Sequence, residues 1–185
     1  MSGAIRVGAN DGASSDPGSI AFLTHEGFEG FRTVGQLYAD GCEEIPNIRG
    51  IYAVVRESLD PPQFMPRSSA ARFRDTDPTI PIDELEQLWV SGAQILFLAR
   101  ARGPGVRSLL KQRLKRYLRF GHGRHVAHWG GRAIWQLRDR SALRVAWKPT
   151  PKDDPARAED EYRDRFKRHY GVLPFANLKD ERDEE

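Results

Sequence analysis

Residues 50–56 read GIYAVVR, and this short stretch decides the fold. β-Branched and aromatic side chains dominate it, and an Ile-Pro pair at 45–46 interrupts the chain just upstream, which predicts a buried β-strand. Two later stretches have the same character, AQILFLAR at 93–100 and ALRVAWKPT at 142–150. The sequence therefore predicts three strands, which are too few for a doubly wound sheet.

Helical patterns lie between and after these strands. In RSLLKQRLKRYLRF (107–120), a rotation of about 100° per residue places Leu110, Leu114 and Tyr117 within one narrow arc, with the cations elsewhere. A last helix is predicted over 154–170, because Asp-Pro begins it and a glycine follows it. We expect the α/β class, as an α+β sandwich in which a small three-stranded, mostly antiparallel sheet is flanked by helices.

Changes of composition divide the rest of the chain. Residues 1–18 are rich in Gly, Ser, Ala and Asp, which is typical of a flexible N-terminal arm. Residues 19–45 predict an adapter segment packed on the core, with a short helix capped by Thr33. The main domain then covers 46–178, and a charged tail covers 179–185.

A long stretch rich in Pro, Ser and Asp follows the first strand, at 58–81. It predicts an irregular loop, and loops of that length are usually functional or disordered. A short helix follows it, with Pro81 at its start and acidic residues in its first turn.

Size and composition narrow the class of protein. The chain has 185 residues, of which 39% are hydrophobic, so it can build one packed core. No apolar run approaches the roughly 18 residues of a membrane span, and the N-terminus lacks the pattern of a secretory signal. The single cysteine, Cys42, excludes an internal disulfide framework. We expect a protein of the cytoplasm that does not enter membranes.

The formal net charge of +3 conceals a strong segregation. Residues 100–144 hold 13 lysines and arginines but one acid, Asp139, a net +12, whereas the remainder holds 16 basic and 25 acidic residues, a net −9. The basic segment also carries histidines and the aromatic residues Trp129 and Trp135. Cations interleaved with aromatic residues favour nucleic acid over a membrane surface.

One carboxylate of the last predicted helix lies on its core side. Relative to Tyr162, Phe166 lies at about +40° and Glu159 at about +60° around the helix axis. A carboxylate turned toward a core needs a cation, a metal ion or several hydrogen-bond donors. A glutamate at the rim, paired with an arginine, satisfies the same pattern.

The Gly50-Ile51-Tyr52 strand, the second strand, an arginine-bearing helix, a glutamate-bearing helix and a downstream asparagine together resemble the GIY-YIG nuclease superfamily over about residues 45–178. The second family triad, Tyr-Ile-Gly, falls on Phe97-Leu98-Ala99 and lacks the tyrosine hydroxyl and the glycine. The family's functional positions match Tyr52, Arg113, Tyr117, Glu159 and Asn177.

This resemblance implies a GIY-YIG-type fold and the hydrolysis of DNA phosphodiester bonds with one divalent cation, Mg²⁺ or Mn²⁺. In the family scheme Tyr52 activates water and Glu159 holds the metal ion. Arg113, assisted by Tyr117, stabilises charge on the phosphate. Asn177 orients water or supports the backbone. The substrate-binding residues expected in and beside the basic segment are Arg100, Arg107, Lys111, Lys115, Arg116, His128 and Arg132.

The change at Phe97 leaves two further readings open. Loss of one hydroxyl that contacts the reacting groups costs about 1.5 to 3 kcal/mol, roughly one to two decades in rate. The first reading is a weakened nuclease, and the second is a nucleic-acid-binding module on an inactive nuclease scaffold. A third reading is an interaction domain whose basic face docks on an acidic protein.

Overall fold

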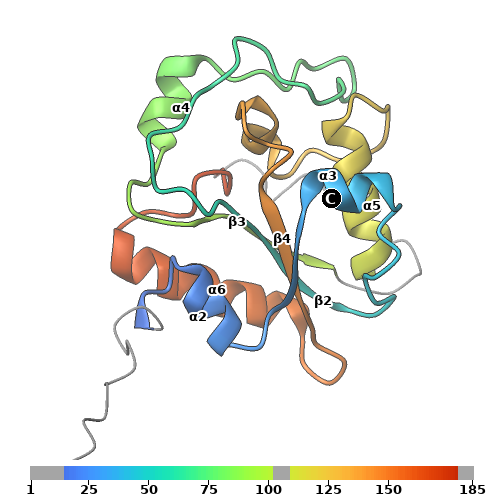
Figure 1. Cartoon of the computed structure of the whole chain (residues 1–185), viewed down its shortest axis with the longest axis vertical. Coiled ribbons are helices and arrows are strands. Elements are labelled where there is room, and N and C mark those ends of the chain that lie inside the picture. Colours follow the sequence, from blue (N-terminus) through green and yellow to red (C-terminus); the bar gives the residue numbers. More distant parts are fainter. Residues whose placement is uncertain (1–14, 102–108, 179–185) are drawn as a thin grey trace, which may run out of the picture.

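The computed structural model describes residues 15–101 and 109–178. At its centre lies one antiparallel sheet of four strands in the order β1-β4-β2-β3 (Figure 1). The strands are β1 (Glu29–Thr33), β2 (Gly50–Val55), β3 (Ile95–Ala101) and β4 (Arg144–Pro149). Strand β3 therefore occupies one edge of the sheet and β1 the other.

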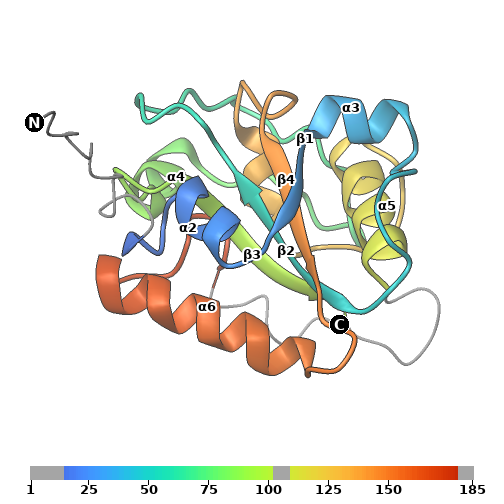
Figure 2. The same ribbon diagram turned by 60° about the horizontal axis from the view of Figure 1, so that its bottom comes forward.

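Helices cover both faces of this sheet. They are α2 (Ile20–His25), α3 (Val34–Ala39), α4 (Ile82–Leu88), α5 (Leu110–Gly121) and α6 (Pro155–Tyr170), with a 3₁₀ helix η2 (Arg132–Gln136). Helices α6 and α2 lie against one face, and α5 and α3 lie on the other (Figure 2). None of the helices in the described part of the chain is long and apolar enough to cross a bilayer.

The pleat of β2 produces two cores. All six residues of this strand are buried, as the GIYAVVR pattern predicts. Tyr52 and Val54 point to the core beneath α5, and Ile51, Ala53 and Val55 point to the core beneath α6. The sheet is therefore covered on both sides, and the α+β sandwich is confirmed.

The predicted number of strands was wrong, because β1 was missed. This strand lies in the segment 19–45, which was expected to be an adapter, and it pairs with β4. Its residues are exposed or half-buried, Gly30 and Phe31 have φ values of 90° and 49°, and the register shifts within the strand. Such a strand lacks the alternating pattern by which strands are recognised. Thr33 does cap α3, as predicted, with a reciprocal bond to Gln36.

The ends of the chain are described only in part. Residues 1–14 of the predicted arm and the predicted tail, 179–185, lie outside the described residues. The last residues of the arm are buried, and the carbonyl oxygen of Gly18 accepts hydrogen bonds from the backbone of Gln94 and Ile95.

The buried side chain of Gln136, in η2, anchors the long loop over 58–81 at two points. Its Nε2 donates to the carbonyl oxygens of Met65 (3.1 Å) and Ile80 (2.8 Å), and its Oε1 accepts from the backbone N–H of Ile80 (2.7 Å). The neighbouring Trp135 is fully buried. The stretch between α5 and β4, which carries the predicted substrate-binding residues His128 and Arg132, thus also contributes a core helix.

Gly50, the first residue of the GIY triad, has a packing role. A Cβ atom here would lie 2.5 Å from the carbonyl oxygen of Lys148 and 2.6 Å from Cδ1 of Leu110. Only a residue without a side chain allows β2, β4 and α5 to approach this closely.

We predict that Gly50→Ala lowers the free energy of unfolding by about 1 to 3 kcal/mol, because the added methyl group overpacks this junction. Gly35→Ala is the matched control. Gly35 lies in helix α3, and a Cβ atom there would meet its nearest neighbour, Ser141 O, at 3.4 Å. That variant should leave stability unchanged or raise it by up to about 1 kcal/mol. Urea unfolding of both variants checks the difference, and equal stabilities would contradict it.

Candidate functional site

A pocket of about 320 Å³ opens at the edge strand β3. It is lined by Phe97, Leu98, Ala99, Arg100, Arg113, Gly130, Glu159, Asp160, Arg163 and Asn177. Consecutive residues of β3 point to opposite faces of the sheet, so the pocket draws on both faces at once. Three of the five predicted catalytic residues line it, namely Arg113, Glu159 and Asn177.

Asn177 closes the free edge of β3. Its Oδ1 accepts from the backbone N–H of Leu98 (2.9 Å), and its Nδ2 donates to the carbonyl oxygen of Leu98 (2.8 Å). The next contact along the strand is a backbone bond from Ala176 N–H to Leu96 O (2.8 Å). Asn177 thus takes the place of a neighbouring strand and fixes the backbone between Phe97 and Arg100. Of the two roles expected for Asn177, support of the backbone is the one that these contacts describe.

Glu159 is 6% exposed and lies between two arginines. Its Oε2 accepts from Nη1 of Arg100 (2.6 Å), and its Oε1 accepts from Nη1 of Arg163 (3.0 Å). Its core-side position agrees with the angular prediction, and pairing with arginine is the alternative that the sequence left open. Its role as a metal ligand stays a prediction. Burial raises the pKa of the Glu159 carboxyl above its ordinary 4.5, although the two arginines act to lower it.

The pocket has an excess of positive charge. Arg100, Arg113 and Arg163 line it, against the carboxylates of Glu159 and Asp160. Guanidinium groups bind phosphate oxygens well because their N–H donors match the geometry of the anion. Arg163 was missed in the sequence, where its only signal is a spacing of four residues from Glu159 on one helix.

These residues offer few oxygen ligands to a metal ion. In residues 15–101 and 109–178, no three His, Cys, Asp or Glu side chains form a group that could hold a metal ion. Glu159 and the neighbouring Asp160 both line the pocket. Mg²⁺ is commonly held by one or two carboxylates, with water and substrate phosphate completing its octahedron. Glu159 and Asp160 reach that number of carboxylates, but both oxygens of Glu159 already accept hydrogen bonds from arginines.

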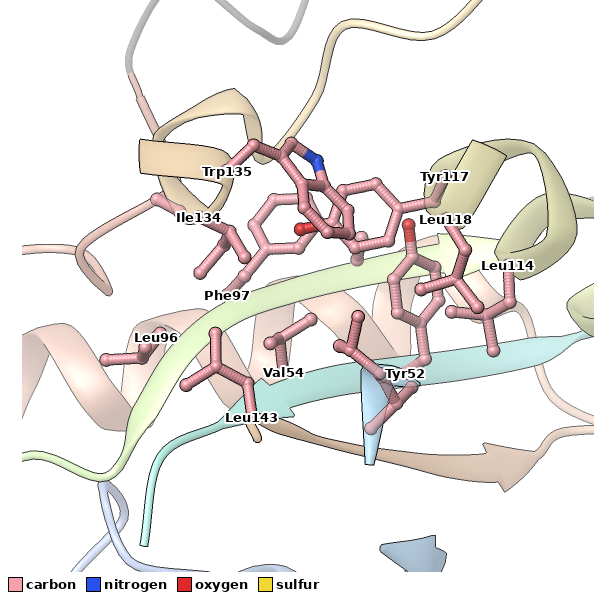
Figure 3. Packing of buried hydrophobic residues seen from close by; sticks show 14 of the residues in the cluster. Tyr52, Val54, Leu96, Phe97, Leu114, Tyr117, Leu118, Ile134, Trp135 and Leu143 are labelled. Atoms are coloured by element: carbon pink, nitrogen blue, oxygen red, sulfur yellow. The ribbon is translucent and has the colours of Figure 1, made fainter. Parts of the chain in front are cut away.

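Tyr52 and Tyr117 lie in a buried cluster that also holds the rings of Phe97 and Trp135 (Figure 3). The ring of Phe97 lies 6.1 Å from that of Tyr52 and 5.8 Å from that of Tyr117. Both tyrosines are fully buried, and Tyr117 donates from its hydroxyl to the carbonyl oxygen of Gly131 (3.3 Å). Of these three rings, only Phe97 lines the pocket.

His128 is a neutral core residue beside the pocket. Burial, together with the positive charges of Arg113 and Arg116, holds its pKa well below the usual range. Its Nε2 lies 3.1 Å from the carbonyl oxygen of Gly130. A carbonyl oxygen only accepts, so Nε2 carries the proton and donates it. His128 therefore acts through hydrogen bonding and packing, without the charge of a phosphate-binding cation.

The remaining predicted substrate-binding residues do not converge on one surface. Lys111 and Lys115 each lie about 160° around the axis of α5 from Arg113, and Lys111 donates to the carbonyl oxygen of Glu43. Arg116 lies on the same side of α5 as Arg113. Arg132 lies over the ring of Trp129, 4.7 Å from its centroid. The predicted residue Arg107 lies outside the described residues.

Comparison of the chain with protein-family models, with curated proteins and with solved structures finds no match. The resemblance to GIY-YIG nucleases therefore depends on the residues quoted from the sequence.

We predict that the Glu159 carboxyl titrates above 4.5 in the folded protein. A carboxyl whose pKa is higher in the folded than in the unfolded state adds to the stability of the fold. This stabilisation is complete below the unfolded-state pKa and is lost as the pH rises through the folded-state pKa. Glu26 is the internal control. Although burial opposes it, hydrogen bonds from Tyr162 and Arg165 lower the pKa of Glu26, so its contribution is lost as pH falls.

Carboxyl ¹³C NMR titration separates the two groups, with Glu159→Gln assigning the signal. A Glu159 midpoint below 4.5 would show that the arginines outweigh burial.

Proposed function

We propose that this protein is a divalent-metal-dependent DNA endonuclease that hydrolyses phosphodiester bonds in the pocket at β3. The observation that supports this most is the convergence of Arg113, Arg100 and Glu159 on one pocket from three separate elements, α5, β3 and α6. Arg113, Glu159 and Asn177 are positions that the resemblance to GIY-YIG nucleases had assigned to function.

The arginines bind and polarise the phosphodiester. Arg113 neutralises charge on the nonbridging oxygens as the phosphorus gains a fifth oxygen, and this charge is largest in the transition state. Arg100 and Arg163 are held in place by Glu159, so little side-chain entropy is lost when the phosphate arrives.

Glu159, with Asp160 beside it, is the carboxylate that would hold the cation. Bound there, Mg²⁺ would supply Lewis-acid polarisation of the phosphate and would lower the pKa of a water molecule. The carboxylate of Glu159 is kept in place by the same two arginines that face the substrate. The proposed metal ligand, Glu159, and the phosphate-binding arginines, Arg100 and Arg163, therefore form a single preorganised unit.

Tyr52 has the role of proton acceptor for the attacking water in this scheme. An ordinary tyrosine pKa near 10 requires nearby positive charge for that role, and Arg113 and a metal ion are the available sources. Tyr52 is fully buried and does not line the pocket, whereas Phe97, whose ring lies 6.1 Å from that of Tyr52, does. The role therefore requires the side chains at the pocket wall to move when the substrate binds.

We predict that the purified chain nicks plasmid DNA in Mg²⁺ and loses this activity in EDTA. Arg113→Ala and Glu159→Gln should each reduce the rate by about 100-fold or more, because each removes a charge from the reacting centre. Arg157→Ala is the control. Arg157 is an exposed residue of α6, so its replacement should leave the rate unchanged. Wild-type cleavage by folded Glu159→Gln protein would rule out Glu159 as the metal ligand.

A second prediction concerns Phe97, where the family has a tyrosine. Phe97→Tyr adds a hydroxyl at the pocket wall and should raise the cleavage rate by about 10- to 100-fold. Phe97→Leu adds no hydrogen-bonding group and should give no increase. Single-turnover cleavage of a labelled duplex measures both, and equal rates for the wild type and Phe97→Tyr would contradict the proposed cost of the missing hydroxyl.

The second candidate is a DNA-binding module without cleavage. It is favoured by the full burial of Tyr52 and by the pairing of both Glu159 oxygens with arginine. Such a module binds DNA with equal affinity in Mg²⁺ and EDTA, with steep salt dependence, and produces no cut strands. A binding assay beside the cleavage assay distinguishes the two functions.

A further inference from the structure

A strained turn lies within the long loop before α4. Phe73 and Thr76 exchange two backbone hydrogen bonds of 3.1 and 2.8 Å, which enclose a two-residue turn. The two central residues, Arg74 and Asp75, have φ values of 47° and 62°. Turns of this kind favour Asn and Gly, because other side chains are strained there. Strain of this sort persists only where the surroundings impose it, and it often marks a functional site.

The surroundings of this turn are firmly anchored. The backbone N–H of Ala71 donates to Phe120 O (2.9 Å), and Oγ of Ser69 donates to Gly121 O (2.8 Å), which ties the loop to the end of α5. In Figure 1 the loop, coloured teal to green, passes along the top of the molecule to that helix end. Arg72 donates twice to the carbonyl oxygen of Asp75, at 3.2 and 2.6 Å, and so braces the turn from inside.

The turn places an aromatic ring and a cation beside the segment that leads into η2. The rings of Phe73 and Trp129 lie 5.9 Å apart, although the two residues come from distant parts of the chain. The guanidinium of Arg74 lies 5.1 Å from the centre of the Phe73 ring, and that of Arg132 lies 4.7 Å from the centre of the Trp129 ring. We name these four residues the aromatic–arginine surface.

This surface adjoins the pocket. Trp129 directly precedes Gly130, which lines the pocket, and Gly131 would meet the ring of Phe97 if it carried a Cβ atom. Asp75 belongs to the turn, and Asp77, directly after it, is paired with Arg72 at 3.9 Å. Within the aromatic–arginine surface, Arg74 lies over the ring of Phe73 and Arg132 over the ring of Trp129.

We propose that the aromatic–arginine surface is a DNA contact surface, which holds the nucleotides next to the phosphodiester bound in the pocket. Its guanidinium groups match the phosphates, and its aromatic rings offer faces on which bases or sugars pack. An acidic protein would need the cations but not the rings. The inference rests on the proposed function, since it extends that same site, and it gives the strained turn a purpose: to present Arg74 and Phe73.

The test separates stability from binding. Arg74→Gly removes the side chain and relieves the strain at φ 47°, so its melting temperature should be unchanged or higher. Its affinity for a 20-bp duplex, measured by fluorescence anisotropy in EDTA, should fall roughly 3- to 10-fold, with a salt slope smaller by about 1. Phe73→Ala should weaken binding by a similar factor through lost stacking. Arg157→Ala removes the same charge from an exposed site on α6 and should bind as the wild type does.

Each outcome has a distinct meaning. A wild-type chain that binds no duplex overturns the proposed function and this inference with it. A wild type that binds and cleaves, with Arg74→Gly and Phe73→Ala matching Arg157→Ala, overturns this inference alone. Polyglutamate serves as a probe for an acidic protein. If the Arg74 and Phe73 variants lose as much affinity for polyglutamate as for DNA, the surface is assigned to a protein partner.

Discussion

The edge position of β3 is the constraint on which the candidate site depends. An interior strand is screened by a neighbour on each side, whereas β3 is paired only with β2. Its other edge is closed by the side chain of Asn177, which satisfies one N–H and one C=O group of Leu98. Unpaired backbone groups at a buried edge would cost roughly 1 to 3 kcal/mol each. Because Asn177 and the backbone of Ala176 close the edge without a further strand, room remains beside it for Arg100 and Phe97, which point to opposite faces of the sheet.

A second dependence is electrostatic. Glu159 is almost fully buried, and an isolated carboxylate could not stay charged there. Arg100 and Arg163 keep it charged, and it keeps them fixed in turn. Buried pairs of this kind contribute little net stability, since desolvation offsets most of their attraction. Their value here is geometric: they hold two guanidinium groups and a carboxylate at one pocket, which Arg113 also lines.

Much of the fold was predictable from local pattern. The buried strand β2, the caps of α3 and α6 and the buried stripe of α5 follow from residue type and periodicity, and the structure confirms them. Strand β1 was not predictable, because its glycine, its register shift and its exposed residues leave no alternation to recognise. The core role of Trp135 and Gln136 was hidden too, since both belong to a short 3₁₀ helix within a basic segment that suggests solvent.

The candidate site, like the fold, was predictable from the sequence only in part. Helical angles placed Glu159 toward the core, but they could not show which arginines lie opposite, because Arg100 comes from β3, far away in the sequence. The charge segregation predicted one basic face, whereas α5 points Lys111 and Lys115 away from Arg113. Sequence separation likewise concealed the meeting of Phe73 with Trp129, which depends on how Gln136 and Ser69 fix the long loop.

The most direct test of this account is a crystal structure of the chain bound to a short DNA duplex with Mn²⁺, using anomalous scattering to locate the metal. The account predicts a phosphate hydrogen-bonded to Arg113 and Arg100, with the manganese peak against Glu159. A duplex bound elsewhere, or a manganese ion held by other side chains, would contradict the assignment of the β3 pocket as the site of phosphodiester hydrolysis.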